Sequence, residues 1–518
     1  MTPPLPELVQ ALLDPAAYPE PPPQIELVQT QMSFVFLAGD YVYKVKKPVN
    51  LGYLDYTTLA KRELYCRREV ELNRRLCAEA YLDVVPITRE RGRILIGGRG
   101  KTIECAVKMR RLPQEKMLNV LLGKDQATSE MLGRVAEKLA GFHREAETSP
   151  AISKFGDLAT ITQNIEENFS QTEQYVGRTV SLQKYLRIKE YTHSFIKRNT
   201  VLFRQRVAEG RIRDCHGDLH AAHICFADGL CIYDCIEFND RFRYCDVASE
   251  VAFLAMDLDH YGRADLSRSF IKAYVAKSQD KPLLELLNFY KCYRAYVRGK
   301  VEGFKLDDPY IIEKESVRQV ASSYFDLAHS YLRSRPLLLI TVGLVGTGKS
   351  VVAQALAKRL GLVVISSDVT RKQLANVPLT EHRFEGFDRG IYTTGFTRLT
   401  YDTMFSEAKD VLREDGVVIM DASFIKAAER QKAKKLADEM KTDFFVVECQ
   451  LDERTIRQRL AQRLSEGSVS DGRWEILEPQ KKEFAPVVEI SPPNHVIINT
   501  SKPVEENVRH VMERIGEG

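Results

Sequence analysis

The sequence lacks a long apolar segment. Its longest apolar run, PLLLITVGLVG at residues 336–346, falls far short of the roughly 20 residues that a membrane helix needs. The opening residues, MTPPLPELVQALLDP, have neither the basic start nor the apolar core of a secretory signal. We therefore expect no membrane association and a cytoplasmic location.

The sequence also lacks a dominant charge and a cysteine framework. A net charge of +4 over 518 residues argues against a whole-surface attraction to nucleic acid, although it leaves room for a local basic pocket. The ten cysteines include no Cys-x2-Cys pair, and in a cytoplasmic protein we expect them to be reduced and mostly buried. The length predicts two to four structural units, at roughly 100–200 residues each.

The chain divides into two parts with different predicted patterns of secondary structure. Residues 1–110 predict a small β-rich lobe with one amphipathic helix at 59–79, and residues 111–335 are mostly helical, with a hairpin at 222–238 and a connector at 305–336. From residue 336 to 518, strands and helices alternate, which is typical of a parallel sheet covered by helices. We predict an α+β kinase-like bilobal domain over 1–335 and an α/β P-loop domain over 336–518.

Residues 343–350, GLVGTGKS, fit the phosphate-binding pattern G-x-x-x-x-G-K-[ST] at every position. The loop follows a predicted strand and opens a predicted helix, so its backbone N–H groups can surround phosphates. Lys349 can reach the β- and γ-phosphates, and the Ser350 hydroxyl can hold Mg²⁺. The predicted ATP-binding residues of this loop are Gly343, Gly346, Thr347, Gly348, Lys349 and Ser350.

Three further residues follow strands of this predicted sheet. Asp368 ends the second strand, where it can take the proton of an attacking hydroxyl or cap a helix. Arg371 lies one helical turn further on and can hold an anionic acceptor. Asp421 ends the strand VVIM, where it can bind a Mg²⁺ water or serve as an ordinary strand-end cap.

A basic helix follows the strand that ends near residue 451. It contains Arg454, Arg457, Arg459 and Arg463. Such arginines can act as a lid over the transferring phosphate, or they can form a solvated basic face. Arg459 and Arg463 are spaced i,i+4 and share a helix face, so we select these two as candidate catalytic residues.

The segment from 336 to about 500 resembles the P-loop kinase group that includes gluconate kinase, the zeta-toxin kinases and the kinase half of polynucleotide kinase. The motifs GLVGTGKS, SSDVTRK and VVIMDASF and the lid arginines carry this resemblance. The Asp-x-x-Arg motif is similar to that of polynucleotide kinase, which implies a general base in Asp368 and an acceptor-phosphate ligand in Arg371. These motifs specify phosphoryl transfer and leave the acceptor open.

A second phosphotransferase pattern lies at residues 215–226, CHGDLHAAHICF. Asp218 and Asp234 are spaced for one carboxylate that orients the acceptor hydroxyl and one that binds Mg²⁺. Upstream, Lys44 ends a strand and Glu69 lies on the following helix, as in the Lys–Glu pair of kinase folds. Lys46 shares the strand face of Lys44, so the choice between these two lysines stays open.

Residues 31–300 resemble the aminoglycoside phosphotransferase family, which is related to protein kinases. The order of VYKV, REVELNRRL, HGDLH and IYDCIEF carries the resemblance, and the fusion to a P-loop module is similar to bacterial two-domain proteins of this kind. It implies that Asp218 is the catalytic base, Asp234 the Mg²⁺ ligand and Asp246 a structural residue. The family has Asn at the second metal position, where this chain has His223. Because Mg²⁺ prefers oxygen ligands, His223 leaves the metal and the activity of this site open.

The leading hypothesis is a bifunctional kinase with two separate ATP sites, dependent on ATP and Mg²⁺, that acts on small hydroxyl-bearing molecules such as a sugar. One alternative is a kinase of nucleotide or nucleic-acid ends in the C-terminal half. Another is an ATP-binding regulator with an inactive N-terminal kinase. A zinc site among the histidines and cysteines of 215–245 is a further alternative. The oligomeric state stays open.

Overall fold

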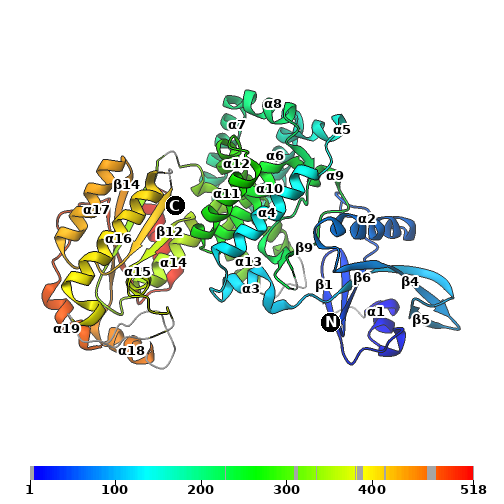
Figure 1. Ribbon diagram of the computed structural model, residues 1–518, viewed down its shortest axis with the longest axis horizontal. Helices are drawn as coiled ribbons and strands as arrows, with labels where there is room; N and C mark the ends of the chain where they lie inside the picture. The colour runs from blue at the N-terminus through cyan, green and yellow to red at the C-terminus, as the bar shows by residue number, and fades with distance from the viewer. Residues whose placement is uncertain are drawn as a thin grey trace.

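The computed structural model describes residues 5–227, 229–307, 313–333, 335–379, 381, 389–413, 416–463 and 474–516. Three lobes follow one another along its longest axis, with the β-rich lobe at one end and the P-loop domain at the other (Figure 1). Among the described residues, no helix combines the length and the apolar character needed to cross a membrane.

The small lobe is built on a six-stranded antiparallel sheet of order β1-β2-β3-β6-β4-β5. Its elements are α1 (Glu7–Leu12), β1 (Ile25–Gln29), β2 (Ser33–Ala38), β3 (Tyr41–Lys46), α2 (Leu59–Cys77), β4 (Tyr81–Glu90), β5 (Arg93–Ile96) and β6 (Lys101–Arg110). In β3, Tyr43 and Val45 are buried in the core of the lobe. Because strand side chains alternate, Lys44 and Lys46 lie on the opposite face, toward α2.

The middle lobe is mostly helical. Its elements are α3 (Leu118–Gly123), α4 (Ser129–Glu145), α5 (Pro150–Ser153), α6 (Leu158–Thr172), α7 (Leu182–Arg198), α8 (Thr200–Ala208), β7 (Ile212–Asp214), β8 (Ile224–Cys225), β9 (Cys231–Ile232), α9 (Asp240–Arg243), β10 (Tyr244–Asp246), α10 (Val247–His260), α11 (Ala264–Ser278), α12 (Leu283–Phe304) and α13 (Lys314–Ser330). Helix α10 runs through the centre, since every residue from Val247 to Asp259 is buried. The short hairpin β8–β9 lies within the predicted hairpin region.

The prediction of a connector at 305–336 is wrong for most of its length. Residues 314–330 form α13, and Phe325 and Leu327 are part of the main apolar core of the middle lobe. The apolar residues of this segment recur at helical spacing, which buries one face of α13 against α12.

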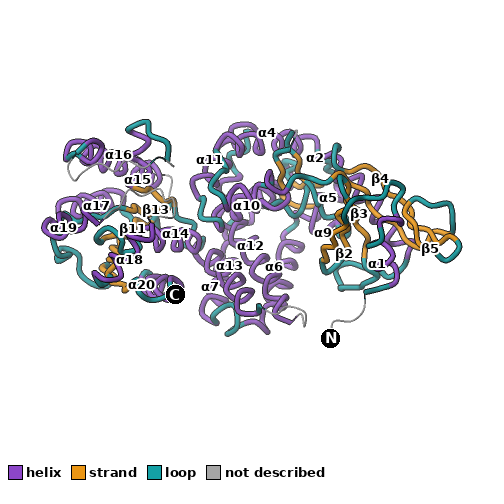
Figure 2. Tube along the Cα trace, turned by 90° about the horizontal axis from the view of Figure 1, so that it is seen from below, coloured by secondary structure: helices purple, strands orange, loops and turns teal. Residues whose placement is uncertain are grey.

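The C-terminal domain has a five-stranded parallel sheet of order β12-β13-β11-β14-β15. Its elements are β11 (Leu337–Val342), α14 (Lys349–Leu360), β12 (Val363–Ser366), α15 (Ser367–Leu374), α16 (Thr394–Arg413), β13 (Val417–Asp421), α17 (Ala427–Met440), β14 (Asp443–Gln450), α18 (Glu453–Arg463), α19 (Trp474–Glu483), β15 (His495–Asn499) and α20 (Val504–Arg514). Helices α16 and α17 pack on one face of the sheet and α14 and α20 on the other (Figure 2). The predicted fold class is confirmed for both parts of the chain.

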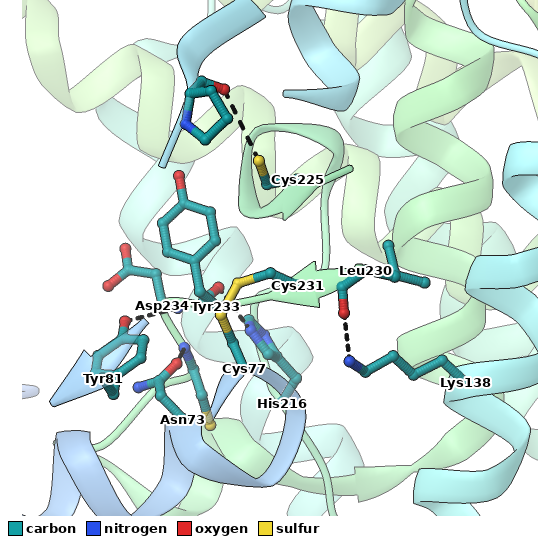
Figure 3. Close-up of a disulfide and its surroundings, with 12 residues drawn as sticks. Asn73, Cys77, Tyr81, Lys138, His216, Cys225, Leu230, Cys231, Tyr233 and Asp234 are labelled. Carbon is teal, nitrogen blue, oxygen red and sulfur yellow. Dashed lines mark hydrogen bonds between the residues drawn. A yellow bond between two sulfur atoms is a disulfide. The ribbon is translucent and has the colours of Figure 1, made fainter. Parts of the chain in front are cut away.

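The structure contains a disulfide between Cys77, the last residue of α2, and Cys231, the first residue of β9 (Figure 3). The prediction that all ten cysteines are reduced is therefore wrong for these two, while the other eight are free. The two partners are 154 residues apart in sequence, and their Cα atoms lie 4.7 Å apart, within the range a disulfide requires. Only the packing of α2 against the hairpin brings them together.

Candidate functional site: two phosphotransfer centres

The phosphate loop connects β11 to α14. Gly343, Gly346 and Gly348 have φ values of 145°, 79° and 83°, a region that favours glycine. A Cβ at Gly343 would lie 2.6 Å from the backbone oxygen of Cys449, so this position admits no side chain. The loop is held from outside by Thr500, whose hydroxyl donates to the backbone oxygen of Thr347 at 2.8 Å.

Ser350 and Lys349 of this loop both act on Asp421 at the end of β13: Ser350 by a hydrogen bond and Lys349 by its charge. Lys349 Nζ donates to the backbone oxygen of Leu344 at 2.8 Å. Asp421 is buried and receives hydrogen bonds from Ser350 and from Thr341, the latter at 3.2 Å. Burial raises the pKa of Asp421, and Ser350 and Lys349 oppose that rise. Ser350 and Asp421 thus form a hydroxyl–carboxylate pair with the donor set that suits Mg²⁺.

Asp368 and Arg371 lie on α15, which begins directly after β12. The Arg371 side chain is buried, and its guanidinium donates to the backbone oxygen of Ile391 at 2.6 Å and to the Thr397 hydroxyl at 3.1 Å. No ion pair within 4.0 Å joins Arg371 to a carboxylate of the described residues, and its Nε has no hydrogen-bond partner. Burial consequently lowers the pKa of Arg371.

The arginines of α18 point in different directions. Arg459 donates to the backbone oxygen of Thr500 at 2.7 Å and lies against Gly348 of the phosphate loop. Arg457 instead pairs with Glu453 and stacks on Trp474, with 3.8 Å from its guanidinium carbon to the ring centre. The side chain of the second selected arginine, at position 463, lies outside the described residues, as do residues 464–473.

In the N-terminal lobes, two lysines share one glutamate. Lys44 Nζ lies 2.9 Å from Glu69 Oε1 and 2.7 Å from Asp234 Oδ1. Lys46 Nζ lies 2.6 Å from Glu69 Oε2 and also pairs with Glu237. The Lys44 side chain is 18% exposed and that of Lys46 only 1%. Lys44 therefore lines the cleft, and the Lys46 ammonium is buried between Glu69 and Glu237.

The loop that carries Asp218 is held by hydrogen bonds to two acidic side chains of α10. Glu250 accepts hydrogen bonds from the backbone N–H groups of His216 and Gly217 at 2.8 and 2.7 Å. Asp257 accepts one from the N–H of Ala221 at 2.8 Å. His216 donates through Nε2 to the backbone oxygen of Tyr233, next to Asp234 (Figure 3). These contacts fix the position of Asp218, the predicted base, relative to Asp234, the predicted metal ligand.

Asp218 opens into a cavity of about 2070 Å³ that Lys44, Asp234 and His223 also line. Burial raises the pKa of Asp218, but His220 and His223 outweigh it and hold this pKa below its usual value. His220 Nε2 and His223 Nδ1 lie 3.5 and 3.7 Å from Asp218 Oδ2. Asp218 is therefore an ionised group that can orient an acceptor hydroxyl.

His223 stands between the two carboxylates. Its Nδ1 donates to the backbone oxygen of Asp218 at 2.9 Å, and its Nε2 lies 3.5 Å from Asp234 Oδ2. Burial and the neighbouring His220 lower the pKa of His223 to about 4, so the imidazole is neutral near pH 7.

Among the described residues, no cysteine joins His216, His220 or His223 in a group of potential metal ligands; Cys215 instead lies in a buried group with His143 and Glu250. Cys231 is in the disulfide, and Cys235 Sγ accepts from Arg75 at 3.4 Å. The group of potential ligands in the cleft consists of Asp218, His220 and His223, with no thiol.

Sequence reasoning missed three residues of these sites. Glu237 and Glu250 were not singled out, although each is an acid within an apolar stretch, IYDCIEF and VASEVAFLAM; such a charge is a signal because buried acids need partners. Thr500 has no sequence signal, since it lies in the turn after β15 and reaches the phosphate loop only in the folded domain.

A family model described as an AAA domain matches residues 338–487. Uncharacterized protein Rv2004c of Mycobacterium tuberculosis and uncharacterized protein Mb2027c of Mycobacterium bovis are each 32% identical to this chain over 457 residues, covering 88% of this chain and 89% of theirs.

Two solved structures align with different parts of the chain. A gluconokinase from Sinorhizobium meliloti is 20% identical, with a TM-score of 0.25, and covers 36% of this chain and 94% of its own. A choline/ethanolamine kinase family protein from Mesorhizobium loti is 13% identical, with a TM-score of 0.37, and covers 60% of this chain and 88% of its own.

The fold and the two centres define the class of protein. It is a two-part protein in which a β-rich lobe and a helical lobe are joined to a P-loop domain with a five-stranded parallel sheet. Within that class, the chain belongs to the family of the mycobacterial proteins Rv2004c and Mb2027c.

Proposed function

We propose that this protein is a bifunctional ATP-dependent phosphotransferase with two separate nucleotide sites, one in residues 1–335 and one in 336–518. The observation that supports this most strongly is that each part has its own lysine, metal-type carboxylate and candidate base. These are Lys44, Asp234 and Asp218 in the first part, and Lys349, Asp421 and Asp368 in the second. The acceptors are small hydroxyl-bearing molecules, with sugars as the first candidates.

In the N-terminal site, Lys44 binds the α- and β-phosphates, and Glu69 holds the lysine in place. Asp234 is the metal ligand. Asp218 orients the acceptor hydroxyl, and it can receive the proton as the oxygen attacks the γ-phosphorus. This role is consistent with its position in the cavity between the lobes.

In the C-terminal site, the N–H groups of the phosphate loop and Lys349 bind the nucleotide phosphates. Asp368 takes the acceptor proton, Arg371 holds the acceptor, and Arg459 stabilises charge on the transferring group. Ser350 and Asp421 would hold Mg²⁺, which would supply positive charge to the nucleotide phosphates.

The test uses three full-length variants: Asp218→Asn, Lys349→Ala and the double variant. Each is incubated with γ-labelled ATP and a panel of hydroxyl-bearing metabolites, and labelled products are identified by mass spectrometry. We expect Lys349→Ala to lose one set of products and Asp218→Asn another. If both single variants make every product at the wild-type rate, the proposal fails. If Asp218→Asn loses no product while nucleotide still binds to residues 1–335, that part is a regulator instead.

A kinase of nucleotide or nucleic-acid ends is the second candidate for the C-terminal site. Arg371 favours it, because a buried guanidinium with no acid partner among the described residues is suited to an anionic acceptor. Phosphate transfer to an oligonucleotide with a 5′-hydroxyl is compared with transfer to the sugar panel in the Asp218→Asn background. Transfer to sugars alone would reject this candidate.

A further inference from the structure

The N-terminal cleft has an imidazole, that of His223, at the position where the resembled family has an amide. The tautomer of His223 follows from its hydrogen bond: Nδ1 lies 2.9 Å from a carbonyl oxygen, that of Asp218, so Nδ1 carries the proton. The lone pair is then on Nε2, the atom that lies 3.5 Å from Asp234 Oδ2. A backbone carbonyl that fixes the tautomer in this way is a common partner of metal-binding histidines.

Asp234 has one oxygen free for an ion. Its Oδ1 is occupied by Lys44 at 2.7 Å, whereas Oδ2 faces His223. Two ligands of one ion at bond lengths of about 2.1 Å lie roughly 3.0–3.5 Å apart. The observed separation of Nε2 and Oδ2 therefore suits a shared cation without a change of side-chain rotamer.

The other potential side-chain ligands near His223 are Asp218 and a second imidazole, His220, whose Nε2 lies 3.5 Å from Asp218 Oδ2. Asp218 Oδ2 lies 3.7 Å from His223 Nδ1, on the acceptor side of the cleft. The adjoining cavity leaves room for the oxygens of a triphosphate. A site with one imidazole, one carboxylate and phosphate oxygens differs from an all-oxygen Mg²⁺ site, because imidazole favours transition metals and Mg²⁺ favours hard oxygen donors.

We propose that the N-terminal site binds its nucleotide together with a divalent transition-metal ion, with Mn²⁺ as the probe of this class, held by His223 Nε2 and Asp234 Oδ2 in preference to Mg²⁺. The inference rests on the proposed function only in that this cleft binds ATP.

The experiment uses full-length protein with Lys349→Ala, which removes the phosphate-loop cation of the other site. Mn²⁺ and a non-hydrolysable ATP analogue are added, and electron spin-echo modulation reports nitrogen bound to the manganese. His223→Asn replaces the nitrogen ligand by an amide oxygen. His193→Asn is the matched control, because His193 is a half-exposed histidine that pairs with Glu166 on the surface of the helical lobe.

We expect nitrogen modulation in the parent and in His193→Asn, and its loss in His223→Asn. We also expect the ratio of Mn²⁺ to Mg²⁺ affinity, measured by calorimetry with the analogue present, to fall about tenfold or more in His223→Asn. Bound Mn²⁺ without nitrogen coupling in the parent, or an unchanged affinity ratio in His223→Asn, would overturn the metal assignment and leave the proposed kinase intact. Failure of the analogue to bind with either ion would overturn both.

Discussion

The two lysines of β3 support one sharp prediction, because they share Glu69 but differ in burial. Replacing Lys46 by methionine leaves Glu237 with only the Tyr56 hydroxyl, which donates to it at 2.6 Å. It also removes the partner of Glu69 Oε2, while Oε1 keeps Lys44. Replacing Lys44 instead frees Asp234, whose side chain is 39% exposed and can be hydrated.

The difference in burial between Lys46 and Lys44 determines how much stability each substitution is expected to cost. Removing one member of a fully buried ion pair costs about 3–5 kcal/mol, since it leaves an uncompensated charge. We therefore expect Lys46→Met to lower the free energy of unfolding by about that amount, and the melting temperature by roughly 5–10 °C. Lys44→Met should cost about 1 kcal/mol. Its main effect should be a loss of about 10²-fold or more in N-terminal turnover, because it removes a cation from the phosphates.

Thermal melting and product formation, both in the Lys349→Ala background, measure the two effects. Lys101→Met, at an exposed position of β6, is the control for loss of a surface cation. The assignment of the lysines would be refuted if Lys46→Met melted like the control but lost activity, while Lys44→Met stayed active.

Three further predictions follow from single positions. Gly343→Ala should abolish nucleotide binding at the phosphate loop, because the new Cβ would meet the Cys449 backbone oxygen; titration with a fluorescent ATP analogue in the Asp218→Asn background checks this, and binding at the wild-type level would contradict it. Burial lowers the pKa of Lys300 to about 8 from 10.5, so its charge costs stability below pH 8, and the cost disappears as pH rises from 8 to 10.5. Lys300→Met should therefore stabilise the protein by about 1–3 kcal/mol at pH 7 and by nothing above pH 10.5, as measured by urea unfolding; a gain independent of pH would refute the cause. Arg206→Met should destabilise by about 3–5 kcal/mol, since it removes the ion-pair partner of the buried carboxylate of Asp246 and leaves that of Asp280 with Arg211 at 3.8 Å, and a melting temperature equal to that of wild type would contradict this.

Short sequence patterns predicted the phosphate loop and the individual helices and strands, because these structures depend on residues close together in the chain. The phosphate loop follows from eight consecutive residues, and β11 and α14 flank it where the alternation of strand and helix placed them. Helix α2 and strand β3 were predicted within a few residues, since burial on one face imposes a period of 3.6 or 2. The connector prediction is wrong at α13 because the apolar face of 314–330 is buried against α12, a contact that neighbouring residues do not reveal.

The sequence by itself determined the two kinase-type motif sets and the residue types at each position, His223 among them. Only the tertiary structure decided which lysine faces the cleft, which nitrogen of His223 faces Asp234, and that Cys77 meets Cys231. The physical reason is distance along the chain. Lys44 and Asp234 are 190 residues apart, and charges so far apart in sequence interact only after folding has brought the lobes together and excluded water from between them.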